Sequence, residues 1–213
     1  MTAHLNHALG NPMILFLMLL LVQDSDEYQD EWITVAPPRI GARIKMPSRP
    51  VFSENAIQPV HDQPEIVLRT RSMDLPGGKS TLTFEYHDEH EMPRGRRQVD
   101  AVLNGAITGA IALVNGELVT QSDVFKKNYK GSDFVYKCEV EDAKLQKVHK
   151  LTVRSQVILV EKRLYSMNYI AEADAYDDKI ASRFFKSFEL VKSPGDAPPK
   201  PRAGRARQLS ESK

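Results

Sequence analysis

The feature that most constrains the fold is a two-residue alternation of apolar and polar side chains that recurs along the chain. Residues 134–141 show it most clearly, because an apolar set alternates there with residues that are mostly charged. Successive side chains of a strand point to opposite faces, so the pattern predicts a strand with one buried and one solvent-facing side. Residues 81–87 and 150–154 repeat it. Such half-buried strands are typical of antiparallel sheets. The apolar set is Phe134, Tyr136, Cys138 and Val140.

Residues 157–171 are expected to form a β-hairpin, because the apolar segments VILV and LYSMNYIA flank the polar turn EKR. Gly77-Gly78 is expected to form a second hairpin turn. The following Lys79 does not complete a phosphate-binding loop, because the Gly-x-x-x-x-Gly-Lys spacing is absent and a strand follows. Further strands are predicted at residues 42–46, 66–73, 118–125 and 188–191.

Two helices interrupt this strand-rich pattern. Residues 99–114 carry apolar side chains at the i, i+3, i+4, i+7 spacing of one helical stripe, and Asn115-Gly116 supplies a left-handed stop. A second helix is predicted from Asp174, as the N-cap, through Phe185. The predicted fold class is therefore α+β, with a single antiparallel sheet packed by the long amphipathic helix and with the C-terminal helix nearby.

Composition favours one globular domain and gives no overall field that would attract nucleic acid. The 213 residues are 41% hydrophobic, and 29 lysines and arginines balance 28 aspartates and glutamates. The single cysteine, Cys138, has no partner within the chain for a disulfide, so the fold depends on core packing.

The chain divides into a leader (1–23), a globular region (24–192) and a tail (193–213). Residues 13–22, MILFLMLLLV, are an unbroken apolar run followed by an acidic stretch, which favours a signal peptide and an exported, periplasmic or extracellular protein. An uncleaved membrane anchor and a buried segment of the domain are the alternatives. The tail is basic and rich in proline, which predicts a disordered, solubilising extension or a contact with an anionic surface.

Short motifs near both ends of the globular region resemble those of the PsbP-like superfamily, an α+β fold shared by the extrinsic photosystem II protein, the Ran-binding Mog proteins and many exported bacterial proteins. At the start, Trp32 to Val35 leads through Gly41 into residues 42–47, ARIKMP. At the end, the tyrosine strand 165–169 leads through residues 183–188, RFFKSF, into Glu189-Leu190. Gly131 before Phe134-Val135-Tyr136 matches the glycine that precedes a middle strand of the family.

The resemblance implies a PsbP-like αβα sandwich over residues 32–191 and a non-enzymatic protein that docks to partners. It transfers no catalytic residue, because the matching positions are core and turn residues. Fold does not fix function, so the photosystem role is not transferred either.

The segment His87-Asp88-Glu89-His90-Glu91 concentrates side chains that bind metals. His87, His90 and one of the carboxylates, such as Glu91, would form a divalent-cation site if the chain turned after His87, and His149 is the one distant histidine that could be a third. The more ordinary interpretation is a solvated loop. A metal-assisted hydrolase that uses His87, His90 and Glu91 is therefore an alternative function.

Two other groups of residues have weaker chemical interpretations. Arg94, Arg96 and Arg97 precede the long helix, where they would either bind an anion or form a solvated entry loop. Cys138 would be a nucleophile beside His149, but its place on the apolar face favours a small buried hydrophobe.

We therefore predict an exported, non-catalytic binding or accessory protein, with no catalytic, cofactor-binding or metal-binding residue and no cofactor. Its partner would be a protein or a small ligand and not nucleic acid. Membrane contact would occur only through the leader, if it is retained. An envelope structural protein anchored by the N-terminal segment is a further alternative.

Overall fold

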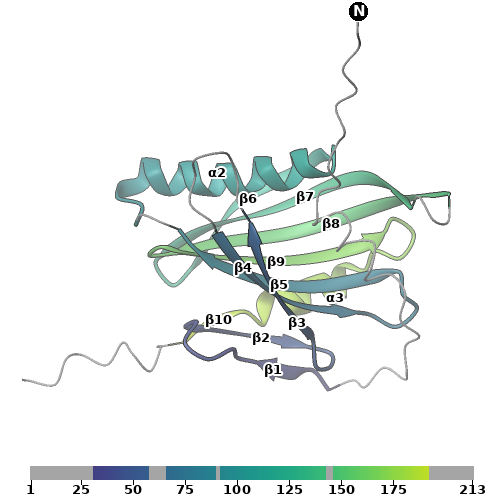
Figure 1. Ribbon diagram of the computed structural model, residues 1–213, viewed down its shortest axis with the longest axis horizontal. Helices are drawn as coiled ribbons and strands as arrows, with labels where there is room; N and C mark the ends of the chain where they lie inside the picture. Colours follow the sequence, from purple (N-terminus) through teal and green to yellow (C-terminus); the bar gives the residue numbers. More distant parts are fainter. Residues whose placement is uncertain (1–30, 58–65, 90–91, 143–145, 192–213) are drawn as a thin grey trace, which may run out of the picture.

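The computed structural model describes residues 31–57, 66–89, 92–142 and 146–191, which form two sheets and two helices arranged in layers (Figure 1). The larger sheet has seven antiparallel strands in the order β3-β4-β5-β9-β8-β7-β6, and the smaller sheet has the order β1-β2-β10. The elements are β1 (Ile33–Val35), β2 (Ala42–Met46), β3 (Val51–Ile57), β4 (Ile66–Asp74), β5 (Ser80–Asp88), α2 (Gly95–Leu113), β6 (Glu117–Lys126), β7 (Tyr129–Asp142), β8 (Lys147–Val160), β9 (Arg163–Glu172), α3 (Asp178–Lys186) and β10 (Glu189–Leu190).

The expectation of a single sheet is wrong, because β2 does not join the large sheet. It pairs instead with β1 and with β10, where Leu190 opposes Ala42 across 148 positions of sequence. The alternate residues Ala42, Ile44 and Met46 are buried and pack face to face against the large sheet. Alternation of apolar and polar residues identifies the buried face of a strand, but it does not identify the strands with which it pairs.

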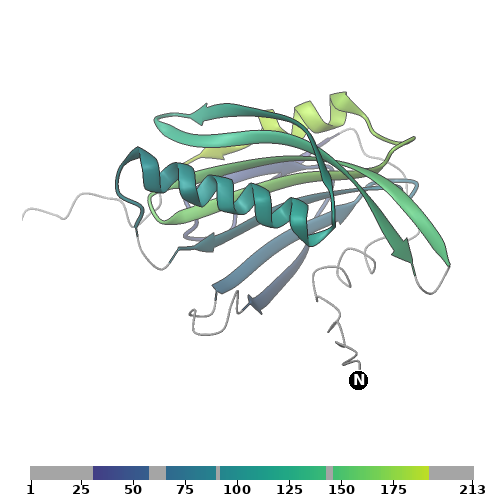
Figure 2. The same ribbon diagram turned by 90° about the horizontal axis from the view of Figure 1, so that it is seen from above.

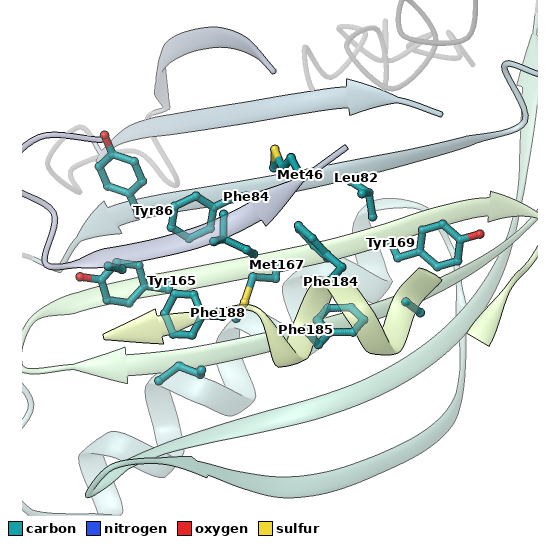
Figure 3. Packing of buried hydrophobic residues seen from close by; sticks show 14 of the residues in the cluster. Met46, Leu82, Phe84, Tyr86, Tyr165, Met167, Tyr169, Phe184, Phe185 and Phe188 are labelled. Atoms are coloured by element: carbon teal, nitrogen blue, oxygen red, sulfur yellow. The ribbon is translucent and has the colours of Figure 1, made fainter. Parts of the chain in front are cut away.

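The first core lies between the large sheet and the layer formed by α3 and the small sheet (Figure 3). Strands β5 and β9 supply alternate residues to it, and Phe84 opposes Met167 in the register of the two strands. The rings of Phe84 and Tyr165 are stacked, with centroids 6.2 Å apart, and Phe188 is tilted against both. Because α3 is short, the small sheet completes the cover of this apolar face.

Helix α2 lies over the other face of the large sheet (Figure 2), and the second core is formed between the two. Leu103 and Ile107 are the buried residues of the helix, and they pack with Phe134, Tyr136 and other apolar residues of β7, β8 and β9. The predicted apolar stripe therefore faces the sheet. The predicted stop is also present, because Asn115 has φ 49° and the Gly116 N–H donates to the Ile111 carbonyl at 2.9 Å.

The predicted strands at residues 42–46, 66–73, 118–125 and 188–191 correspond to β2, β4, β6 and β10, and Gly77-Gly78 turns β4 into β5. The 157–171 hairpin is formed by β8 and β9. The start of the C-terminal helix was predicted one turn too early. Asp177 caps α3 by accepting hydrogen bonds from the Lys179 and Ile180 amides, whereas Asp174 pairs with Lys79. Strand β3, with the mixed sequence VFSENAI, was not predicted.

Candidate binding groove between helix α2 and strand β6

Strand β6 forms one edge of the large sheet, and in the described part of the chain only β7 pairs with it. Nearly all of its side chains are exposed, including Leu118 (43%), Val119 (50%) and Phe125 (64%). Met92, just before α2, is 55% exposed. Four of the eight exposed large apolar side chains of the described residues therefore lie on β6 or just before α2, and the other four lie on β1, β3 and β8.

Two pockets lie between α2 and β6. The first, of about 520 Å³, has Met92, Val99, Phe125 and Leu159 among its walls and Arg96 at its rim. The second, of about 270 Å³, lies farther along the helix between Ile107 and Ile111 of α2 and Leu118 and Gln121 of β6. Both pockets are open to solvent and mainly apolar. Together they form the groove, which we define as the two pockets and the face of β6 between them.

Lys130 of β7 crosses the floor of the groove between its two walls. Its ammonium nitrogen lies 2.7 Å from Asp100 Oδ1 on α2 and 3.0 Å from Asp123 Oδ2 on β6. These contacts raise the pKa of Lys130, and the hydrogen bond from Lys130 lowers the pKa of Asp100. The salt bridges therefore fix the separation of the walls and leave no unpaired charge at this point of the floor.

The helix wall is unusual in that no charged residue occurs between Asp100 and Glu117. Its outward positions include Asn104, Gly105, Thr108 and Gly109, all exposed. A Cβ atom added at either glycine would meet nothing within 4 Å. Packing among the described residues therefore requires neither glycine, although each costs about 1 kcal/mol relative to alanine in a helix interior.

Strand β6 retains an edge on which another strand can add. A β-bulge between Leu118 and Thr120 interrupts its pairing with β7, and regular pairing continues from Thr120 to Lys126. Natural edge strands are commonly protected by charges, prolines or bulges. Here Asp123 is the one acidic residue between Thr120 and Lys126, and it is held by Lys130.

The predicted metal residues are only partly described. His87 Nε2 lies 3.3 Å from Glu89 Oε1, and Asp88 is bound by Arg163 at 2.6 and 2.9 Å. His149 lies toward the opposite end of the large sheet, where its Nδ1 is 2.7 Å from Glu172 Oε1. His90 and Glu91 lie outside the described residues. Within the described ranges, no group of three histidine, cysteine, aspartate or glutamate side chains is placed to hold a metal ion.

The three arginines that were expected to precede the long helix do not all do so, because α2 begins at Gly95 and Arg96 and Arg97 lie in its first turn. Arg94 is the N-cap residue, and its amide donates to Gln98 Oε1. The Arg96 guanidinium lies 3.8 Å from Asp100 and is mostly exposed at the rim of the first pocket, and Arg97 is also exposed. Of the three predicted anion-binding residues, only Arg96 belongs to the groove.

Cys138 is buried in the second core, as its alternation predicted. Burial raises the pKa of its thiol to about 11, so the thiol remains protonated at neutral pH. His149 is on the same face of the sheet but hydrogen bonds to Glu172. The structure therefore places Cys138 among core residues and not in a nucleophile–base pair.

The leader (1–23) and the tail (193–213) lie outside the described residues, so their predicted roles stay predictions. Among the helices that the structure does describe, none has both the length and the apolar character needed to cross a bilayer.

The layer order, with one long helix on one face of an antiparallel sheet and a short helix with a small sheet on the other, is that of an α+β sandwich of the PsbP-like type. The solution structure of cyanobacterial PsbP (CyanoP) from Synechocystis sp. PCC 6803 matches this chain with a TM-score of 0.52 and 12% sequence identity, covering 80% of this chain and 99% of that one. A crystal structure from Bacteroides thetaiotaomicron VPI-5482 matches with a TM-score of 0.43 and 10% identity, over 78% of this chain and 50% of that one. No family model and no curated protein matches the sequence. The match to the CyanoP structure confirms the predicted PsbP-like fold, and at 12% identity it shows the fold alone.

Sequence reasoning identified β6 and α2 as elements but did not identify the groove. Two signals were present. Apolar residues in β6 occur as the adjacent pairs Leu118-Val119 and Val124-Phe125, which no single buried face explains. The helix also has a long uncharged stretch with two interior glycines, Gly105 and Gly109.

Proposed function

We propose that this protein is an exported, non-catalytic accessory protein that binds an extended segment of a partner protein in the groove between α2 and β6. The single observation that carries the proposal is the free edge of β6 beside two apolar pockets. A partner segment would add as a further strand and would place alternate side chains toward the pockets.

An extended peptide fits this site better than a compact ligand. Strand addition obtains affinity from main-chain hydrogen bonds and specificity from pockets that receive alternate side chains. The two pockets lie near opposite ends of β6. Phe125 lines the first pocket and Leu118 lines the second. The Lys130 salt bridges lie between them, so a single compact ligand would not fill both pockets.

Export is supported by the sequence of the leader. The apolar run 13–22 has the length of a signal-peptide core, and Gln23 and Asp24 end it before it reaches the length of a membrane span. N-terminal sequencing of the mature protein tests this part of the proposal. A mature chain that begins within the acidic stretch 24–31 supports export with cleavage, whereas an intact Met1 contradicts cleavage and favours the retained membrane anchor.

The absence of a catalytic role is supported by the state of the candidate nucleophile. The Cys138 thiol is buried and has a raised pKa, whereas nucleophilic cysteines have lowered pKa values and solvent access. His149, the nearest candidate base by sequence reasoning, is held by Glu172 and lies on the strand that flanks β7.

The proposal is tested by selecting binders from a library of random peptides on the full chain, then measuring their affinities by fluorescence anisotropy. Peptides with alternating apolar residues are expected. Leu118→Asp places a charge in the second pocket, so it is expected to lower the affinity for these peptides by about tenfold or more. Phe125→Ala, at the first pocket, is expected to act in the same direction.

Phe52→Ala is the matched control, because Phe52 is a half-exposed phenylalanine on β3, the opposite edge of the same sheet. It is expected to leave the affinity unchanged. A library that yields no binder, or binders that are insensitive to Leu118→Asp and Phe125→Ala, would overturn the proposal. Circular dichroism of each variant establishes that a loss of affinity does not come from unfolding.

A further inference from the structure

A second cleft, of about 360 Å³, adjoins the first pocket of the groove and differs from it in charge. The two share Tyr129 and Glu161 as lining residues. Three exposed cations, Arg39, Lys127 and Lys162, also line the cleft. None of the three forms an ion pair with a described residue of the chain.

The acidic residues of the cleft offset its cations only in part. Asp88 binds Arg163, whose guanidinium donates to both carboxylate oxygens at 2.6 and 2.9 Å, and Arg163 together with the more distant Lys162 lowers the pKa of Asp88. Glu161 is the remaining acid, and it stands against three cations. The cleft therefore has a net positive charge, and focusing of the field in a concave site favours an anionic ligand.

The cations are carried on tight turns that hold their positions. Arg39 has φ 65° and Lys127 has φ 55°, and Gly41, which also lines the cleft, has φ 70°. The Arg163 guanidinium also donates to the Arg39 carbonyl at 3.1 Å, and the Tyr165 hydroxyl donates to the Ile40 carbonyl. These contacts tie the 39–41 turn to β9, beside the turn of Lys162.

We infer that the partner segment is acidic at one end, and that its carboxylates occupy this cleft while its apolar residues lie in the groove. The inference rests on the proposed function and names the chemistry of the partner. It follows from two observations. The cationic cleft adjoins the first pocket of the groove at Tyr129, and the cleft has a net positive charge. Each carboxylate would meet an exposed lysine or arginine, so these contacts would be weakened by salt.

The experiment compares two versions of one peptide enriched by selection on the full chain. In the second version, every aspartate and glutamate is replaced by serine. On the wild-type protein the acidic version is expected to bind about fivefold to tenfold more tightly at low salt, because each exposed ion pair contributes a modest amount. The difference is expected to shrink as sodium chloride is added.

The same pair of peptides is then measured on the double variant Lys127→Asn and Lys162→Gln. Asparagine tolerates the left-handed backbone at position 127, so the turn is preserved. The preference for the acidic peptide is expected to vanish on this variant and to persist on the control Lys179→Gln, an exposed lysine at the start of α3.

The outcomes separate the two proposals. The acidic-partner inference is wrong if the enriched peptides lack carboxylates. It is also wrong if both peptide versions bind the wild type equally while Leu118→Asp still abolishes binding. In either case the proposed peptide site in the groove is retained. If the preference persists on the double variant, the carboxylates lie elsewhere and the inference is also wrong. If no peptide binds, the proposed function fails.

Discussion

The ammonium nitrogen of Lys130 lies 2.7 Å from Oδ1 of Asp100, and this contact joins the long helix to the sheet at the floor of the groove. Because Lys130 also contacts Asp123, one residue holds both walls. The groove is thus prearranged in the free protein, which reduces the ordering cost of binding.

The Asp100–Lys130 contact predicts a pH-dependent effect of Asp100→Asn. Lys130 lowers the pKa of Asp100, so the carboxylate contributes stability above its ordinary pKa of about 4 and loses it as the pH falls through the lowered pKa. Urea denaturation should show the variant less stable than wild type at neutral pH and equal to it in strong acid. Glu141→Gln, at the exposed end of β7, is the control. Equal midpoints at neutral pH would refute the role of this contact.

Glu85 on β5 predicts the opposite pH dependence. Burial raises its pKa from 4.5 to about 7, although Asn168 Nδ2 donates to its carboxylate at 3.4 Å. The folded state therefore binds a proton more tightly than the unfolded state, and stability falls as the pH rises from about 4.5 to about 7. Glu85→Gln should remove this fall, which a pKa shift of this size makes up to about 3 kcal/mol, and should be more stable than wild type at alkaline pH. Urea midpoints measured across this range test it, and parallel curves for the two proteins would contradict it.

Gly131 of β7 and Gly105 of α2 predict opposite effects of the same substitution. A Cβ at Gly131 would lie 2.3 Å from the Val157 carbonyl oxygen, so Gly131→Ala should destabilise the protein by about 2 kcal/mol or more. A Cβ at Gly105 meets nothing, so Gly105→Ala should stabilise it by about 0.5–1 kcal/mol. Thermal or urea unfolding measures both. Effects of the same sign would show that the glycine environments are described wrongly.

Cys138 predicts slow reaction with thiol reagents. Its thiol is buried and its pKa is raised to about 11, so little thiolate is available at neutral pH. Absorbance with Ellman's reagent should show negligible modification of the native protein and complete modification in denaturant. Rapid modification of the native protein would indicate an accessible thiolate and would contradict the placement of Cys138 in the core.

Most elements of the fold are predictable from the sequence because their periodicity is strong. The 99–114 stripe and the alternation around Phe134 both correspond to packed faces. Strand β3 could not be found, because Ser53, Glu54 and Asn55 interrupt its apolar residues and it lies at an edge where neither face is fully covered. The pairing of β2 with β10 depends on contacts between distant segments, which local periodicity does not determine.

The candidate groove was beyond sequence reasoning for a different physical reason. Its pockets arise where α2 lies over β7 and β8 but leaves β6 uncovered, and this offset is a property of packing. The cationic cleft likewise brings Arg39 next to Lys162, although the two are far apart in the chain. By contrast, the role of Gly131 had a signal in the sequence, since its place before a middle strand matched the PsbP-like pattern, and the close Val157 carbonyl now gives the reason.

The most direct test of the account is a titration of isotope-labelled protein with an enriched peptide, followed by backbone amide NMR. The account predicts that amides of Thr120–Lys126 in β6 shift and become protected from hydrogen exchange, together with shifts along the facing side of α2. Protection of β3 amides at the other edge of the sheet, with β6 unchanged, would contradict the central claim.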